Sequence, residues 1–365
     1  MKVWAKTIAV AWMLATVCAM AVELRADHPN VYVVKKGDTL WDISAKFLKK
    51  PWLWPEIWQA NPQVSNPHLI YPGDVLALVY IDGKPRLIRK SRVVKLSPKA
   101  RVVGRGDAIA PLPLETIRPF LVGARVVDKE TLEKAPYMVS SDGDHLMAGN
   151  DVRIYARGFS TDQLVERTNF SIFRPGGEYR DPDTGEILGY EAIHVGTAQL
   201  KRIGDPATLD ITEATREALN GDRLLPVDES HLQPEFFPRA PDKLITGKII
   251  SVYDGVTQIG QYHVVIINRG QREGVMPGHV FTIWTQGAKV RDKVAIERRR
   301  QEEGYNVFKE IGEQITGGDE RDWVKLPDEQ AGQLMVFRVF DKVSLALVME
   351  ATRPIHVYDV IKTPE

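Results

Sequence analysis

The sequence predicts a multi-domain α+β protein in which a small βααβ domain is followed by two tandem β-rich repeats, each a small barrel or sandwich. The 365-residue length suggests two or three domains. Residues 31–80 show two helical patterns between two β-prone runs, and the later part of the chain aligns with itself as two β-rich units. Hydrophobic residues (44%) and charged residues (26%) occur at ordinary globular levels, which argues against wholesale disorder and against a polytopic membrane protein.

The N-terminus has the pattern of a secretion signal. Lys2 and Lys6 precede an uncharged stretch of 15 residues, 7–21, which ends in the small-x-small sequence Ala19-Met20-Ala21. This stretch is shorter than the roughly 20 residues that span a bilayer. We therefore predict a cleaved signal peptide over residues 1–21, an exported protein of the periplasm or cell envelope, and no transmembrane span in the mature chain. A retained N-terminal anchor, or a lipid anchor at Cys18, is the alternative.

Charge and cysteine content exclude several function classes. The chain has 48 basic and 48 acidic residues, so no global positive field would draw it onto nucleic acid. Cys18 is the single cysteine, and signal cleavage would remove it. The mature protein therefore lacks the thiolate that cysteine-type cell-wall enzymes require.

Residues 31–80 begin with a strand and a helix. Residues 31–35 are β-prone, and Gly37-Asp38 is a turn dipeptide. Thr39 can cap a helix, with Asp42 three residues later as a weak capping box. The apolar residues at helical spacing, which predict one buried face, are Leu40, Ile43 and Phe47.

A second helix and a second strand follow. Pro55 suits the first turn of a helix that contains Ile57 and Trp58, and Asn61-Pro62 ends it. Pro72-Gly73 then turns the chain into the β-prone run 75–78. The order is strand, helix, helix, strand.

Three segments in this order carry a family resemblance: YVVKKGDTLWDIS (32–44), WPEIWQANP (54–62) and LIYPGDVL (69–76). They closely resemble the LysM family. The resemblance implies a βααβ fold and binding of N-acetylglucosamine-containing glycan, chiefly peptidoglycan, with peptidoglycan against chitin-like polymer left open. Carried over residue by residue, the implied glycan-binding positions are Gly37, Asp38, Thr39, Leu40, Trp41, Asn61, Pro62, Ile70 and Tyr71.

The residue types at these positions suit a neutral sugar. Exposed loop backbone can hydrogen-bond amide and hydroxyl groups, and an apolar pocket can take an N-acetyl methyl group. The aromatic insert 51–54 departs from the family's common pattern beside the groove. Core packing and sugar stacking remain alternatives for the four tryptophans within 18 positions, of which we expect at least one to be exposed: Trp41, Trp52, Trp54 and Trp58.

Residues 81–112 are interpreted as a linker, with a basic run over 84–99 that is either solvated or attracted to an anionic polymer. Beyond it we predict two β-rich repeats, 113–226 and 237–365. Residues 147–158 align without gaps on 276–287, and Glu213-Ala214-Thr215-Arg216 matches Glu350-Ala351-Thr352-Arg353. The runs expected to be strands in the second repeat are 245–250, 262–267, 279–284 and 334–339.

Two inserts separate the matching pieces. Residues 179–186 predict a polar β-hairpin tip. Residues 288–325 form a longer, charged insert, interpreted as a mobile loop that could include a helix, with a solvated face or a docking surface as alternatives.

Catalytic motifs are missing from the sequence. The eight histidines show no zinc-type spacing, and no nucleophile elbow, phosphate loop or dinucleotide fingerprint occurs. We therefore expect no catalytic residues, no metal and no cofactor. The expected function is a non-catalytic peptidoglycan-binding envelope protein whose repeats contact an envelope protein partner. The alternatives are a cell-wall remodelling hydrolase with an unrecognised active site and a structural component of an envelope or secretion assembly.

Overall fold

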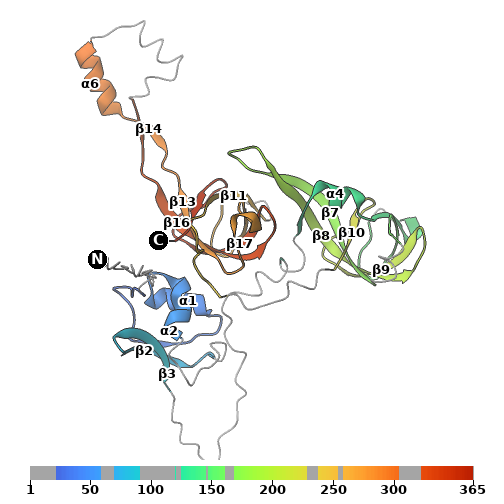
Figure 1. Ribbon diagram of the computed structural model, residues 1–365, viewed down its shortest axis with the longest axis horizontal. Coiled ribbons are helices and arrows are strands. Elements are labelled where there is room, and N and C mark those ends of the chain that lie inside the picture. Colours follow the sequence, from blue (N-terminus) through green and yellow to red (C-terminus); the bar gives the residue numbers. More distant parts are fainter. Residues whose placement is uncertain are drawn as a thin grey trace, which may run out of the picture. The chain divides into compact units, whose positions relative to one another are not determined.

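A computed structural model shows the chain as two compact units, residues 1–109 and 110–365 (Figure 1). The residues that the structure describes are 22–58, 70–90, 120, 125–144, 147–160, 168–227, 237–253, 258–303 and 322–364. The predicted signal peptide, residues 91–112 of the predicted linker, and the candidate site residues Asn61 and Pro62 lie outside these ranges.

The first unit is a three-stranded antiparallel sheet with two short helices. Its elements are β1 (Val31–Val33), α1 (Leu40–Phe47), a 3-10 turn (Pro51–Leu53), α2 (Trp54–Trp58), β2 (Val75–Ile81) and β3 (Lys84–Lys90). The strand order is β1-β2-β3. The βααβ prediction is confirmed. The predicted linker 81–112 is wrong at its start, because the first residues of the basic run form β3. Asp82 and Gly83 (φ 52° and 73°) form a two-residue hairpin turn that pairs β3 with β2.

The helices of the first unit pack as the sequence indicates. Thr39 accepts a hydrogen bond from the Asp42 N–H at 3.1 Å, and the Asp42 carboxylate bonds back to Thr39, which completes the capping box. The three residues at helical spacing on α1 are fully buried. This burial supplies the stabilisation that so short a helix lacks by itself.

The expectation of an exposed tryptophan is wrong. All four side chains are buried: Trp41, Trp52, Trp54 and Trp58. The unit is larger than residues 31–80, because Leu24 bridges to Leu48 at the end of α1 and Arg86 of β3 donates to the Glu56 carbonyl of α2. Leu87 of β3 is also fully buried, so the core of this unit extends beyond residues 31–80.

The second unit begins with a ring of six strands. Its elements are β4 (Arg125–Val127), α4 (Lys129–Lys134), β5 (Tyr137–Ser141), a 3-10 turn (Asp142–Asp144), β6 (Arg153–Arg157), β7 (Asn169–Arg180), β8 (Ile187–Arg202), β9 (Ala207–Ala214) and β10 (Arg223–Pro226). The sheet order is β4-β8-β7-β10-β5-β6-β9, and an additional β8–β9 pairing closes the ring with β4 outside it. We call this ring the first barrel.

A closed barrel of six strands follows, which we call the second barrel. Its elements are β11 (Thr246–Val252), β12 (Val264–Ile267), a 3-10 turn (Gln271–Glu273), β13 (Val280–Thr285), β16 (Glu329–Val339), β17 (Ser344–Ala351) and β18 (Val360–Lys362). Apolar side chains from all six strands fill its interior. The prediction of small β-rich barrels or sandwiches after the βααβ domain is therefore confirmed as barrels.

The two barrels share one topology. When the six ring strands are numbered in chain order, each ring has the cyclic order 1-2-5-4-3-6. Equivalent turns also share hydrogen bonds, since Thr215 and Arg216 donate to the Val195 carbonyl as Thr352 and Arg353 donate to the Ala331 carbonyl. The two Glu-Ala-Thr-Arg segments therefore lie at equivalent turns of the two barrels.

The gapless alignment of 147–158 on 276–287 does not fit this topology, because it places β6, the second ring strand, on β13, the third. In the structure the residue equivalent to Asp151 is instead Tyr262. Both residues have positive φ (60° and 65°), and the backbone N–H of each donates to a carbonyl of the fifth ring strand of its own barrel. Alternating apolar residues after a glycine turn are common to many strands, so local sequence does not identify which strand is which.

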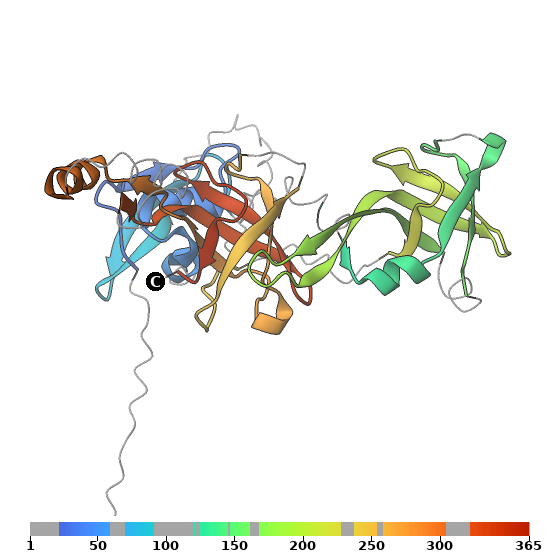
Figure 2. The same ribbon diagram turned by 90° about the horizontal axis from the view of Figure 1, so that it is seen from above.

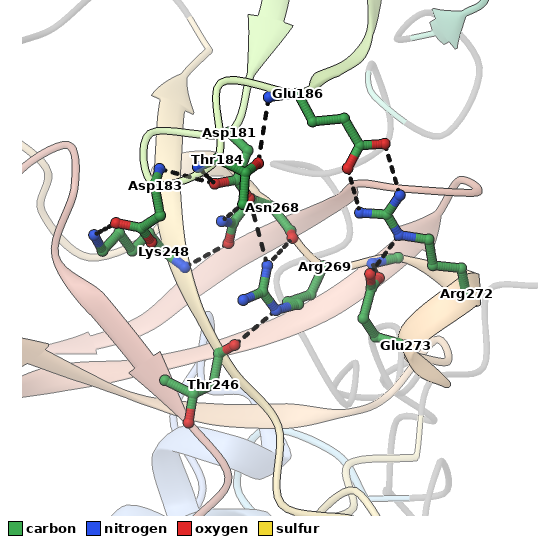
Figure 3. Close-up of polar contacts among 11 residues, drawn as sticks. Asp181, Asp183, Thr184, Glu186, Thr246, Lys248, Asn268, Arg269, Arg272 and Glu273 are labelled. Carbon is green, nitrogen blue, oxygen red and sulfur yellow. Dashed lines mark hydrogen bonds and ion pairs between the residues drawn. The ribbon is translucent and has the colours of Figure 1, made fainter.

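A hairpin from the first barrel joins the two barrels. The hairpin β7–β8 extends to the strands of the second barrel (Figure 2). Its tip, residues 181–186, contacts Lys248, Asn268 and Arg272 (Figure 3). Glu186 of the tip also pairs with Lys342. The predicted hairpin tip is confirmed, and its polar residues form contacts within the chain.

The charged insert of the second barrel forms an arm. It consists of β14 (Lys289–Arg291), α6 (Lys293–Glu303) and β15 (Trp323–Lys325), with β14 and β15 paired as a two-stranded ribbon. Figure 1 shows β14 and α6 extending away from the barrel strands. The helix that the interpretation allowed for is thus present as α6, whereas the ribbon of β14 and β15 was not expected. Residues 304–321 of the insert lie outside the described residues.

Candidate functional site

The first loop of the candidate site connects β1 to α1. The Asp38 carboxylate accepts hydrogen bonds from the Tyr32 hydroxyl at 2.9 Å and from the Lys35 N–H at 2.8 Å. Gly37 is exposed, with φ 92°, a conformation that L side chains rarely adopt. The aspartate therefore holds the loop in a fixed shape with its glycine outward.

Tyr32 is a stable donor in this arrangement. Burial raises the pKa of Tyr32 to about 12, and the adjacent Asp38 carboxylate adds to the shift. The phenol therefore keeps its proton across the physiological range and continues to donate to Asp38.

The second loop precedes β2 and is built in a similar way. The Asp74 carboxylate accepts a hydrogen bond from the Tyr71 N–H at 3.1 Å, and the Asp74 N–H donates to the Tyr71 carbonyl at 3.0 Å. Gly73 has φ 94° and allows the tight turn. Ile70 is buried beneath the loop, whereas Tyr71 is half-buried.

Val34 joins the two loops. Its N–H donates to the Asp74 carbonyl at 2.9 Å, and its carbonyl accepts from the Gly73 N–H at 2.8 Å. The structure thus brings residues 37–41 and 70–71 to one edge of the sheet. Residues 61 and 62, which were assigned to the same site, lie outside the described ranges.

The candidate residues divide into surface and interior positions. Gly37 is exposed, and Asp38 and Tyr71 are half-buried. The side chains that are buried, and that support the loops from below, are Thr39, Leu40, Trp41 and Ile70. A ligand at this edge would therefore meet the loop backbone together with Gly37, Asp38 and Tyr71.

Sequence reasoning missed Arg89. This residue lies on β3, opposite Leu76 of β2, and its guanidinium lies 3.5 Å from the Asp74 carboxylate. Arg89 therefore contacts the same aspartate that shapes the second loop. The basic run was the available signal, but the pairing of β3 with β2 had to be known before Arg89 could be assigned to the site.

The chemistry of this edge suits recognition of a neutral ligand. Loop backbone groups beside a half-buried tyrosine ring can hydrogen-bond amides and hydroxyls and cover an apolar group. Within the part of the chain that the structure describes, no three His, Cys, Asp or Glu side chains gather as a metal site would require. The same part contains no helix of the length and apolarity needed to cross a bilayer.

Comparison with known proteins identifies the domain that contains this edge. Residues 32–78 match the family model of the LysM domain. Over 60 residues the chain is 38% identical to the uncharacterized protein YqbP of Bacillus subtilis (strain 168), a match that covers 14% of this chain and 27% of that protein. The chain thus spans about a quarter of the length of this curated relative (27%). A LysM domain implies binding of peptidoglycan- or chitin-type glycan and is typical of extracellular and cell-wall proteins. The folded edge formed by the two loops is therefore part of a LysM domain, which occupies residues 32–78 of this chain.

Proposed function

We propose that this protein is an exported, non-catalytic component of the cell envelope that anchors to peptidoglycan through its LysM domain and presents its two barrels to a protein partner. The observation that supports the anchor is the direct pairing of the two loops through Val34, which fixes exposed backbone groups and Tyr71 at one edge of the sheet. Preformed loops lose little conformational entropy on binding, which favours recognition of a repetitive polymer.

The construction of the barrels supports the presenting role. Side chains from every strand fill the interior of the second barrel, among them Phe281, Leu334 and Val348. Such a barrel offers other molecules its outer surface and its loops. The hairpin contact between the barrels also holds two such surfaces in one unit. Anchoring by LysM would raise the concentration of this unit at the cell wall.

Co-sedimentation with purified, insoluble peptidoglycan tests the anchor. A chain of residues 22–365 should pellet with peptidoglycan, and a chain of residues 110–365, the second unit alone, should stay in the supernatant. The binding should persist in about 0.5 M salt, because a neutral sugar is recognised without ion pairs. Pelleting of both chains, or of neither, would remove LysM as the working anchor.

The same samples test the hydrolase alternative and the glycan preference. Soluble sugar or peptide fragments released from peptidoglycan by residues 22–365 would contradict a non-catalytic role. Competition by soluble chitin oligomers against soluble peptidoglycan fragments would order the two glycan classes by affinity.

A further inference from the structure

We propose that the arm of the second barrel is a docking element for an extended, acidic segment of a partner protein in which alternate side chains are apolar. This inference deepens the proposed presenting role by naming the surface and the chemistry of its partner. It is independent of the LysM domain, so the two proposals can fail separately.

The first barrel shows what the equivalent connection does. In each barrel the arm position lies between the third and fourth ring strands, β7–β8 in the first and β13–β16 in the second. In the first barrel this connection is a protein contact, because its acidic tip binds basic residues of the second barrel. In the second barrel the same connection is elaborated into the arm, whose ribbon pairs with no other strand among the described residues.

One face of the ribbon is apolar and exposed. Val290 lies directly opposite Val324, and Leu326 donates its N–H to the Ala288 carbonyl, which extends the ladder by one pair. Because side chains alternate across a strand, these four residues share one face. Val290, Val324 and Leu326 are 39%, 45% and 43% exposed. An isolated two-stranded ribbon is only marginally stable in water, so an apolar face of this kind favours a covering partner.

The apolar face continues into a groove on the barrel. A cavity of about 560 Å³ lies between the base of the arm, at Ala288 and Leu326, and the turn at Arg353, Pro354 and His356. Arg353 and Glu329, which both line the cavity, form an exposed ion pair at 3.2 Å. Because Ala288 and Leu326 belong both to the apolar face of the ribbon and to the lining of the groove, a partner on that face can continue into the groove.

The opposite face of the ribbon is cationic. Lys289 lies opposite Lys325, and Arg291 lies opposite Trp323, with its guanidinium 5.7 Å from the ring centroid. Lys325 pairs with Asp328 at 3.2 Å, but no carboxylate among the described residues pairs with Lys289 or Arg291. Like charges directly across a strand pair are unfavourable. An acidic partner would relieve this repulsion.

The two free edges of the ribbon indicate how such a segment would bind. Among the described residues neither strand pairs with a third strand, so the outer backbone groups of each can accept a further strand. In that mode the backbone supplies affinity, while alternate side chains face the two sides of the extended sheet. The partner's apolar side chains would then lie beside the apolar face of the ribbon, and its acidic side chains would lie beside the cationic face.

Selection from a random twelve-residue peptide library on residues 22–365 tests the proposal. The expected peptides are acidic, with apolar residues at alternate positions. Their affinity should fall about tenfold or more in V290S/V324S and in K289E/R291E, because each variant removes one face of the ribbon. The matched control is Ile203→Ser, which replaces an apolar residue of the first barrel that is 56% exposed and should leave affinity unchanged.

Several outcomes would overturn the proposal. Selected peptides without an acidic excess, or with equal affinity for the arm variants, would do so. Self-association of the chain that the arm variants abolish would assign the surface to a second copy. Binding of phosphatidylglycerol vesicles that no selected peptide displaces would assign it to lipid. The arm variants should still pellet with peptidoglycan, so a failure of the LysM anchor would be seen separately.

Discussion

The side-chain amide of Asn268 in the second barrel donates a 2.8 Å hydrogen bond to the carboxylate of Asp181, at the tip of the first barrel's hairpin, and both side chains are buried (Figure 3). The other oxygen of Asp181 accepts the N–H groups of Asp183 and Thr184 at 2.9 Å and 3.0 Å. One carboxylate therefore shapes the hairpin turn and joins the two barrels. Burial by itself raises the pKa of Asp181, but these N–H groups, Asn268 and Arg269 together lower it, so the group remains a charged acceptor.

Asp181→Ala should destabilise the second unit. It leaves the buried Asn268 amide without its acceptor and the turn without its central oxygen, which should lower the free energy of unfolding by about 2 to 3 kcal/mol. Urea denaturation measures this change. The control is Asp183→Ala, which removes an exposed carboxylate from its contact with Lys248 and should cost about 1 kcal/mol or less. Equal losses in both variants would contradict a special role for Asp181.

Acid should weaken the contact between the barrels through Glu186. Hydrogen bonds from Arg272 and Lys342 lower the pKa of Glu186 from 4.5 to about 2. The folded-state pKa is depressed, so the stabilisation is fully present above pH 4.5 and is lost as the pH falls towards 2. The stability difference between wild type and Glu186→Gln should therefore shrink between about pH 6 and about pH 3 in denaturation experiments. A difference that stays constant over this range would show that the ion pairs do not contribute.

Arg89→Met should weaken glycan binding more than it weakens the fold. The pair with Asp74 is partly exposed, so its loss should cost about 1 kcal/mol or less of stability. The second loop would lose a contact that positions Asp74, and we expect a severalfold lower affinity for a soluble N-acetylglucosamine oligomer, measured by titration. The neighbouring exposed residue provides the control, Lys90→Met. If both variants bind like wild type, Arg89 does not position the loop.

Two equivalent glycines should be intolerant of substitution. A Cβ atom at Gly332 would lie 2.1 Å from the Glu350 carbonyl oxygen, and one at Gly196 would lie 2.3 Å from the Glu213 carbonyl oxygen. Because the obstacle is backbone of the adjacent strand, Gly→Ala at either site should cost about 3 kcal/mol or more in thermal or urea unfolding. Gly260→Ala is the control, since its Cβ would meet no atom within 4 Å. Similar tolerance at all three positions would argue against the close strand contact.

Much of the LysM domain could be predicted because its signals are local. The Thr39–Asp42 capping box and the glycine turns involve residues within a few positions of each other. Arg89 could not be assigned in this way, because its contact with Asp74 depends on the pairing of β3 with β2. The burial of all four tryptophans was likewise not predicted, because burial depends on which segments pack together in space.

By itself the sequence determined the strand, helix, helix, strand order of residues 31–80, that these elements form a LysM domain, and that the later part of the chain is β-rich, because hydrophobic periodicity, caps and turns act over a few residues. Only the tertiary structure decided which strand of one barrel corresponds to which strand of the other, and that the hairpin tip binds the next barrel. Asp181 and Asn268 are separated by 87 residues, and their contact depends on the closure of both barrels and on the length of β7 and β8. Such a contact forms only when whole strands pair in one particular order and register. Local sequence does not fix that order, because strands of similar local sequence could also pair in other ways.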